Sequence, residues 1–148
     1  EIHASTLHRV GALLRQLDLV NADDDVMLEM KLPQLFMPHG VGHLLGLQVH
    51  DVAGFQQDLA GTMKAAPEHS PALRNTRTVE ENMVFTIEPG CYFIPLLLEP
   101  QRNTAIGAML NWNLIDELYP YGGIRIEDNI SVTKSGIENL TRKPHQNR

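Results

Sequence analysis

The chain opens with hydrophobic residues spaced as on one face of a helix. Aliphatic side chains recur at three- and four-residue steps, namely Leu7, Val10, Leu13, Leu14 and Leu17. Charged and polar residues separate them, so this pattern predicts an amphipathic helix over residues 3–18. A second, short helix is expected after Asn21, which we interpret as its N-cap, with Pro33 limiting its length.

The middle of the chain has no regular period. Residues 38–54 hold too many glycines for a helix, and we expect ordered loop mixed with short strand there. Residues 55–76, with Gly61, Pro67 and Pro71, are predicted to be loop.

The second half alternates more clearly. Residues 83–88 read as a strand that Pro89-Gly90 ends. Residues 93–120 are interpreted as an insertion in which Trp112 to Leu118 form a helix. Residues 124–132 alternate as a second strand, and the tail from Lys134 is expected to fray. Together these elements predict one α+β domain.

Composition narrows the possible functions. The 148 residues carry a net charge of −6, which argues against a nucleic-acid partner. No stretch is long and apolar enough to span a membrane, so no membrane association is expected. Cys91 is the only cysteine, which fits a reducing cytoplasm. Since the chain begins with Glu1 rather than methionine, we expect it to be a piece of a longer protein.

Carboxylates and histidines provide the candidate chemistry. Each predicted strand carries one carboxylate between aliphatic neighbours, Glu88 and Glu127. A buried carboxylate must be protonated, paired or bound to a metal, although an exposed strand face with solvated charges would also explain the pattern. The stretch HGVGHLLGLQVH adds His39, His43 and His50. Imidazole with carboxylate suits manganese, iron, cobalt or zinc, and from these residues alone a metal site and a structural cluster remain equally open.

Three motifs that follow one another along the chain indicate a family more specifically than the single histidines and carboxylates do. They are PHGVGHLLGLQVHDV, TIEPGCYF and GGIRIEDN. They resemble the metallopeptidase family with the pita-bread fold, which includes prolidase, aminopeptidase P, methionine aminopeptidase and creatinase. The HDVAGF and LRNTR segments look most like the bacterial Xaa-Pro dipeptidases, including the subgroup with organophosphorus acid anhydrolase activity. The resemblance implies a curved, mainly antiparallel sheet with helices on one face. It also implies that residues 1–148 are the C-terminal part of the catalytic domain.

The resemblance implies a site with two divalent ions, manganese first, with cobalt or zinc as alternatives. His43, Glu88 and Glu127 match family ligands, and Glu88 would also be the general base. Two aspartate ligands of the family come from the preceding half of the domain and have no match here, so the metal site of this chain is expected to be incomplete.

Four further residues match positions around the substrate. His50 would hydrogen-bond the scissile carbonyl, and His39 would line the pocket, unless it is only a packing histidine. Arg74 would grip the carboxylate of a dipeptide, unless it is a solvated loop residue. Arg125 would hold Glu127 and nearby carboxylates and contribute to substrate binding.

The function that the resemblance implies is metal-dependent hydrolysis of Xaa-Pro dipeptides, with this chain alone inactive and the full-length protein a homodimer. Three alternatives stay open: a non-catalytic peptide- or protein-binding module of the same fold, an aminopeptidase P, and an organophosphate hydrolase. One departure from the family is the segment Val79-Glu80-Glu81-Asn82-Met83, where many relatives have Pro-Gly.

Overall fold

The computed structural model describes residues 1–142, which form two compact units. The first, the helical unit, combines Glu1–Pro38 with Pro89–Arg125. The second, the sheet unit, combines His39–Glu88 with the chain from Ile126 onward. Each unit is therefore built from two separated stretches of sequence.

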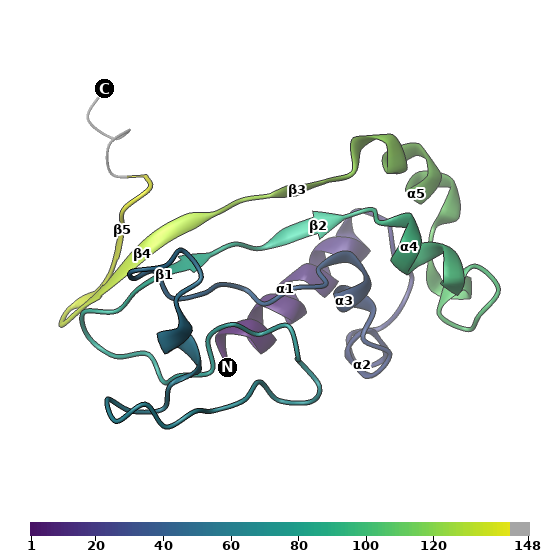
Figure 1. Ribbon diagram of the computed structural model, residues 1–148. Coiled ribbons are helices and arrows are strands. Elements are labelled where there is room, and N and C mark those ends of the chain that lie inside the picture. Colours follow the sequence, from purple (N-terminus) through teal and green to yellow (C-terminus); the bar gives the residue numbers. More distant parts are fainter. Residues whose placement is uncertain (143–148) are drawn as a thin grey trace. The chain divides into compact units, whose positions relative to one another are not determined.

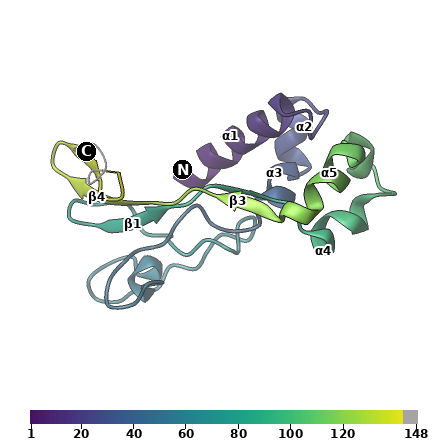
Figure 2. The same cartoon turned by 90° about the horizontal axis from the view of Figure 1, so that it is seen from above.

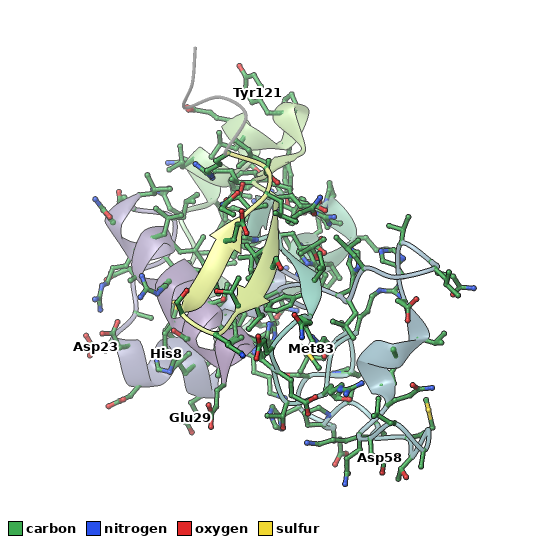
Figure 3. All side chains as sticks on the ribbon, turned by 90° about the vertical axis from the view of Figure 1, so that its left-hand side faces the viewer. His8, Asp23, Glu29, Asp58, Met83 and Tyr121 are labelled. Carbon is green, nitrogen blue, oxygen red and sulfur yellow. The ribbon has the colours of Figure 1, made fainter. Side chains whose placement is uncertain are left out.

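The helical unit begins with three helices, α1 (Ile2–Gln16), α2 (Asp24–Glu29) and α3 (Leu32–Phe36). The helix predicted over residues 3–18 is thus confirmed as α1, which packs against both α2 and α3 (Figures 1 and 2). The buried side of α1 carries Leu7, Val10 and Leu14. Figure 3 labels His8 on α1, Asp23 just before α2 and Glu29 at the end of α2.

Two predictions about α2 are wrong. Its N-cap is Asp23 and not Asn21, because the Asn21 N–H instead donates to the Met109 carbonyl. Pro33 does not end a helix but lies in the first turn of α3, where its missing N–H costs no helical hydrogen bond.

The rest of the helical unit contains β2 (Gly90–Tyr92), α4 (Pro95–Leu98), α5 (Trp112–Leu118) and β3 (Gly123–Arg125). Short 3-10 turns connect them. The predicted helix over Trp112–Leu118 is confirmed, and the Asn111 side chain caps it by accepting from the Leu114 N–H. Strands β2 and β3 pair antiparallel. The core of this unit includes an edge-to-face contact between Phe36 and Phe93, with ring centroids 6.0 Å apart.

The sheet unit holds β1 (Val84–Ile87), β4 (Asp128–Thr133) and β5 (Gly136–Asn139) in the antiparallel order β1-β4-β5 (Figure 1). Its hydrophobic core consists of Leu44, Phe85 and Ile130. The strand predicted over 124–132 is interrupted at residues 126–127, which separate β3 from β4. The expectation of a fraying tail from Lys134 is wrong up to residue 139, because β5 pairs with β4 there.

A long irregular segment leads from residue 39 to β1, as predicted for 55–76. Its one helical turn, Val52–Phe55, is a 3-10 helix. The carboxylate of Asp58, labelled in Figure 3, fixes the outer loop by accepting from the N–H groups of Ala60 and Thr62. Asn82 adopts a left-handed φ of 69°, a conformation that asparagine tolerates better than most residues.

Across the described part of the chain, every helix is too short or too polar to cross a bilayer.

Candidate metal centre

Two carboxylates oppose each other where β1 and β4 meet. Ile87 and Asp128 are register partners, so the next position on each strand sets Glu88 opposite Glu127. Glu88 is only 5% exposed, whereas Glu127 is exposed. Like charges at directly opposed positions destabilise a sheet. This arrangement therefore favours a cation between the two side chains.

The histidine segment runs along the other edge of β1. The N–H groups of Thr86 and Glu88 donate to the carbonyls of His43 and Val41, at 3.0 and 2.8 Å. Gly42 permits this approach, since a Cβ at that position would lie 1.8 Å from the Thr86 carbonyl oxygen. This tight backbone approach buries His43 beside Glu88.

His43, Glu88 and Glu127 form a compact donor set. One ligand atom from each lies within 4.8 Å of the others, and Nε2 of His43 is 3.3 Å from Oε1 of Glu88. Nitrogen and oxygen ligands sit about 2.0–2.2 Å from ions such as Zn²⁺, so this spacing allows both atoms to hold one ion. The two carboxylates and one imidazole fit a divalent transition metal.

The hydrogen bonding of His43 favours the same interpretation. Its Nδ1 lies 3.1 Å from the Leu44 carbonyl oxygen, which can only accept, so Nδ1 carries the proton. In the neutral ring Nε2 then presents a lone pair toward the Glu88 carboxylate. Two acceptors facing each other are stabilised by a cation, and a ligating histidine commonly donates its other N–H in this manner.

Thr86 is the residue at this centre that sequence reasoning did not assign. Its hydroxyl donates to Oε1 of Glu88 at 2.9 Å and accepts from the N–H of His43 at 3.0 Å. The signal that could have found it is its position two residues before Glu88, on the same face of the strand.

His50 lies against the donor set through its ring. The His43 and His50 rings meet edge-on, with centroids 4.3 Å apart at 88°. The Asp51 N–H donates to the Leu44 carbonyl, and this hydrogen bond closes the loop that brings His50 beside His43. The Asp51 carboxylate accepts from the N–H groups of Ala53 and Gln48, and these bonds lower its pKa below the ordinary 3.8.

The other predicted site residues occupy separate surroundings. His39 is half-buried, and its Nδ1 contacts the Gly40 carbonyl at 2.7 Å. Arg74 is exposed, on a loop whose backbone packs against Gly54. Arg125 on β3 donates from Nε to the Tyr92 hydroxyl, with its guanidinium 5.6 Å from the centre of that ring. Their roles toward substrate stay predictions.

Sequence comparison identifies close relatives. The chain is 52% identical over 143 residues to an Xaa-Pro dipeptidase of Aeromonas hydrophila, covering 97% of this chain and 32% of the relative. An Xaa-Pro dipeptidase of Erwinia tasmaniensis is 51% identical over 146 residues, covering 98% of this chain and 33% of the relative. The chain thus spans about a third of the length of these curated relatives.

Structural comparison supports the expected architecture. Aminopeptidase PepP of Pseudomonas aeruginosa superposes with a TM-score of 0.64 at 28% identity, over 96% of this chain and 25% of that chain. A zinc-substituted Escherichia coli aminopeptidase P in complex with product superposes with a TM-score of 0.59 at 32% sequence identity. The match covers 91% of this chain and 23% of that chain. These likenesses confirm the mixed helical and antiparallel pita-bread fold.

A family model described as metallopeptidase family M24 matches residues 3–134, which include all three donors of the candidate centre. The chain belongs to this metallopeptidase family.

Proposed function

We propose that the protein carrying this chain is a metal-dependent Xaa-Pro dipeptidase. The observation that carries the proposal is the meeting of His43, Glu88 and Glu127, whose ligand atoms lie within 4.8 Å of one another. The relatives that are 52% and 51% identical over the aligned residues, about a third of their own length, are Xaa-Pro dipeptidases, which favours this substrate class over longer peptides. Because the chain spans about a third of their length, the activity is proposed for a protein of full length.

His43, Glu88 and Glu127 would hold the metal. A divalent ion held by these residues would supply Lewis-acid chemistry, lowering the pKa of bound water and polarising the scissile carbonyl. The Glu88 carboxylate accepts a proton from the attacking water and passes it to the proline nitrogen as the amide bond breaks. His50, which the ring contact sets beside His43, donates a hydrogen bond to the carbonyl oxygen as negative charge develops there.

Substrate selection is assigned to residues outside the donor set. The Arg74 guanidinium, which is exposed, can make a bidentate pair with the C-terminal carboxylate of a dipeptide. His39 and Arg125 are proposed to line the pocket, with Arg125 also steadying Glu127.

Metal binding is tested by titrating the full-length protein with Mn²⁺ in a calorimeter. We expect saturable binding that His43→Ala abolishes or weakens strongly, because the ring nitrogen ligand is lost. His8→Ala, an exposed histidine on α1, is the matched control and should bind as the unmodified protein does. Equal binding by the His43 variant would remove the basis of the proposal.

The dipeptide preference is tested by Arg74→Ala, assayed on Leu-Pro and on a tripeptide with proline in second place. Loss of the carboxylate anchor should raise KM for the dipeptide at least tenfold and leave tripeptide cleavage little changed. Lys64→Ala, an exposed cation on the same irregular segment, controls for charge. An unchanged KM for Leu-Pro would favour an aminopeptidase P instead.

We also propose manganese as the physiological metal, ahead of cobalt and zinc, and a homodimer located in the cytoplasm. The carboxylate-rich donor set supports a hard or borderline ion, and the single cysteine fits a reducing compartment. Restoring each ion to chelated full-length protein would rank the metals by recovered kcat/KM, and sedimentation would give the oligomeric state.

A further inference from the structure

The Thr86 hydroxyl lies between two groups of the metal centre that are far apart in sequence. Thr86 is on β1 and is 1% exposed. It contacts the side chain of Glu88 and the backbone of His43, both of which are also buried. A single oxygen therefore joins the strand that carries one donor to the segment that carries another.

The direction of both hydrogen bonds follows from the chemistry of the partners. An ionised carboxylate can only accept and a backbone N–H can only donate. The hydroxyl, which has one proton and two lone pairs, therefore gives its proton to Glu88 and receives that of His43. Neither bond can reverse, so the hydroxyl sets a definite orientation for both groups.

The His43 N–H depends on this side chain. Along this edge of β1 the Thr86 N–H donates to the His43 carbonyl, but the reciprocal N–H of His43 goes to the hydroxyl of Thr86 instead of to a backbone oxygen. A buried N–H left without a partner is strongly disfavoured. Removal of the hydroxyl would therefore disturb the segment that holds the His43 ring as well as the carboxylate of Glu88.

We propose that Thr86 is a positioning residue of the metal centre: its hydroxyl aligns the Glu88 carboxylate and fixes the His43 segment so that both donors meet the same ion. The inference rests on the proposed metal-dependent function, and it concerns the assembly of the site rather than contact with substrate. Groups that orient metal ligands in this way typically change metal affinity by about 10–100-fold when they are removed.

The experiment compares Thr86→Val and Thr86→Ser in the full-length protein. Valine keeps the branched shape without the hydroxyl, and serine keeps the hydroxyl. We expect Mn²⁺ affinity measured by calorimetry to fall about 10–100-fold in the valine variant and to stay within a few-fold of the unmodified protein in the serine variant. Thr78→Val, an exposed threonine before β1, is the matched control and should bind normally.

A second readout does not involve metal or activity. Hydrogen exchange of the His43 amide, followed by mass spectrometry on the metal-free protein, should be faster in Thr86→Val and near normal in Thr86→Ser. If valine prevents folding, the same comparison is made between Thr86→Ala and Thr86→Ser. Unchanged Mn²⁺ affinity and amide exchange in a folded variant without the hydroxyl would overturn the inference, as would a folded serine variant that loses affinity tenfold.

The two proposals fail in different ways. A protein that binds Mn²⁺ in a Thr86-dependent manner but hydrolyses no Xaa-Pro dipeptide would contradict the proposed function and leave the positioning role standing. A Thr86→Val variant that hydrolyses Leu-Pro as well as the unmodified protein, at Mn²⁺ concentrations near the dissociation constant, would contradict the positioning role and leave the proposed function standing.

Discussion

At position 42 there is no room for a side chain. A Cβ there would lie 1.8 Å from the carbonyl oxygen of Thr86 and 2.8 Å from its carbonyl carbon, both of them backbone atoms that cannot rotate away. The segment that carries His43 would have to move off β1 to admit even a methyl group. The metal centre thus depends on a residue that contributes no ligand.

We therefore expect Gly42→Ala to lower the free energy of unfolding by at least the ~1–3 kcal/mol typical of overpacking and to weaken Mn²⁺ binding. Urea unfolding and calorimetry measure the two effects. Gly11→Ala is the contrasting control, because its Cβ would lie 2.8 Å from Cγ of the buried Met27, a side-chain atom that can shift further than the backbone of Thr86, and alanine favours the helix. A Gly42 variant as stable as the Gly11 variant would contradict this explanation.

Residue by residue, the three donors could be predicted and their support could not. His43, Glu88 and Glu127 stand in motifs whose resemblance to the metallopeptidase family implies their role as ligands, and the structure brings them together. The bond from the His43 N–H to the Thr86 hydroxyl spans 43 positions and arises only when two segments pair. No local pattern encodes such a bond.

At the scale of elements, the segment between β2 and β3 is held by a cluster of charged and aromatic side chains. Arg102 forms a two-bond pair with Glu99, a further bond to Asp116, and a stacking contact 4.2 Å from the centre of the Trp112 ring. The Tyr119 hydroxyl donates to the same Glu99 carboxylate at 2.8 Å. These side-chain contacts hold the start of the segment, at residues 99–102, against its later part, at residues 112–119.

Desolvation and then the bond to Glu99 raise the pKa of Tyr119 from 10.0 to about 12. The folded state therefore favours the neutral phenol, and the resulting stability is fully present below pH 10 and lost as the pH rises toward 12. Urea unfolding of the unmodified chain should show this loss, and Tyr119→Phe should reduce it. Tyr121→Phe, at a residue 79% exposed, is the control and should leave the alkaline loss unchanged.

Elements with a strong local signal were predicted well, and those defined by pairing were not. The helix Trp112–Leu118 was predicted to the residue, with Pro120 following its end in the sequence, whereas the cap by Asn111 was seen only in the structure. The break between β3 and β4 was missed, since the alternation of residues 124–132 continues through it. Strand β5 was missed as well, because it has only four residues, Gly-Ile-Glu-Asn, and depends on β4 for its hydrogen-bond partners.

At the scale of the whole molecule, the 148-residue chain offers fewer donors than the family resemblance implies. The structure groups three, and the resemblance implies two further aspartates from the preceding half of the domain. We expect this polypeptide by itself, supplied with Mn²⁺, to hydrolyse Gly-Pro or Leu-Pro at least a thousandfold more slowly than a full-length protein that contains it.

A coupled proline assay of both proteins at matched concentration makes that comparison. The His43→Ala form of the short chain serves as the background, because any rate that it shares with the unmodified chain does not come from the centre. A rate for the short chain near that of the full-length protein would show that three donors suffice.

The register of β1 and β4 also makes the centre separable from the rest of the chain. All three donors belong to the sheet unit, and the chain leaves that unit after Glu88 and returns at Ile126, next to the strand position it left. A two-residue Asn-Gly turn is a common connection between such adjacent antiparallel ends. A turn of this kind could bypass the whole helical unit, so that a synthetic miniprotein of about half the chain would contain all three donors of the candidate centre.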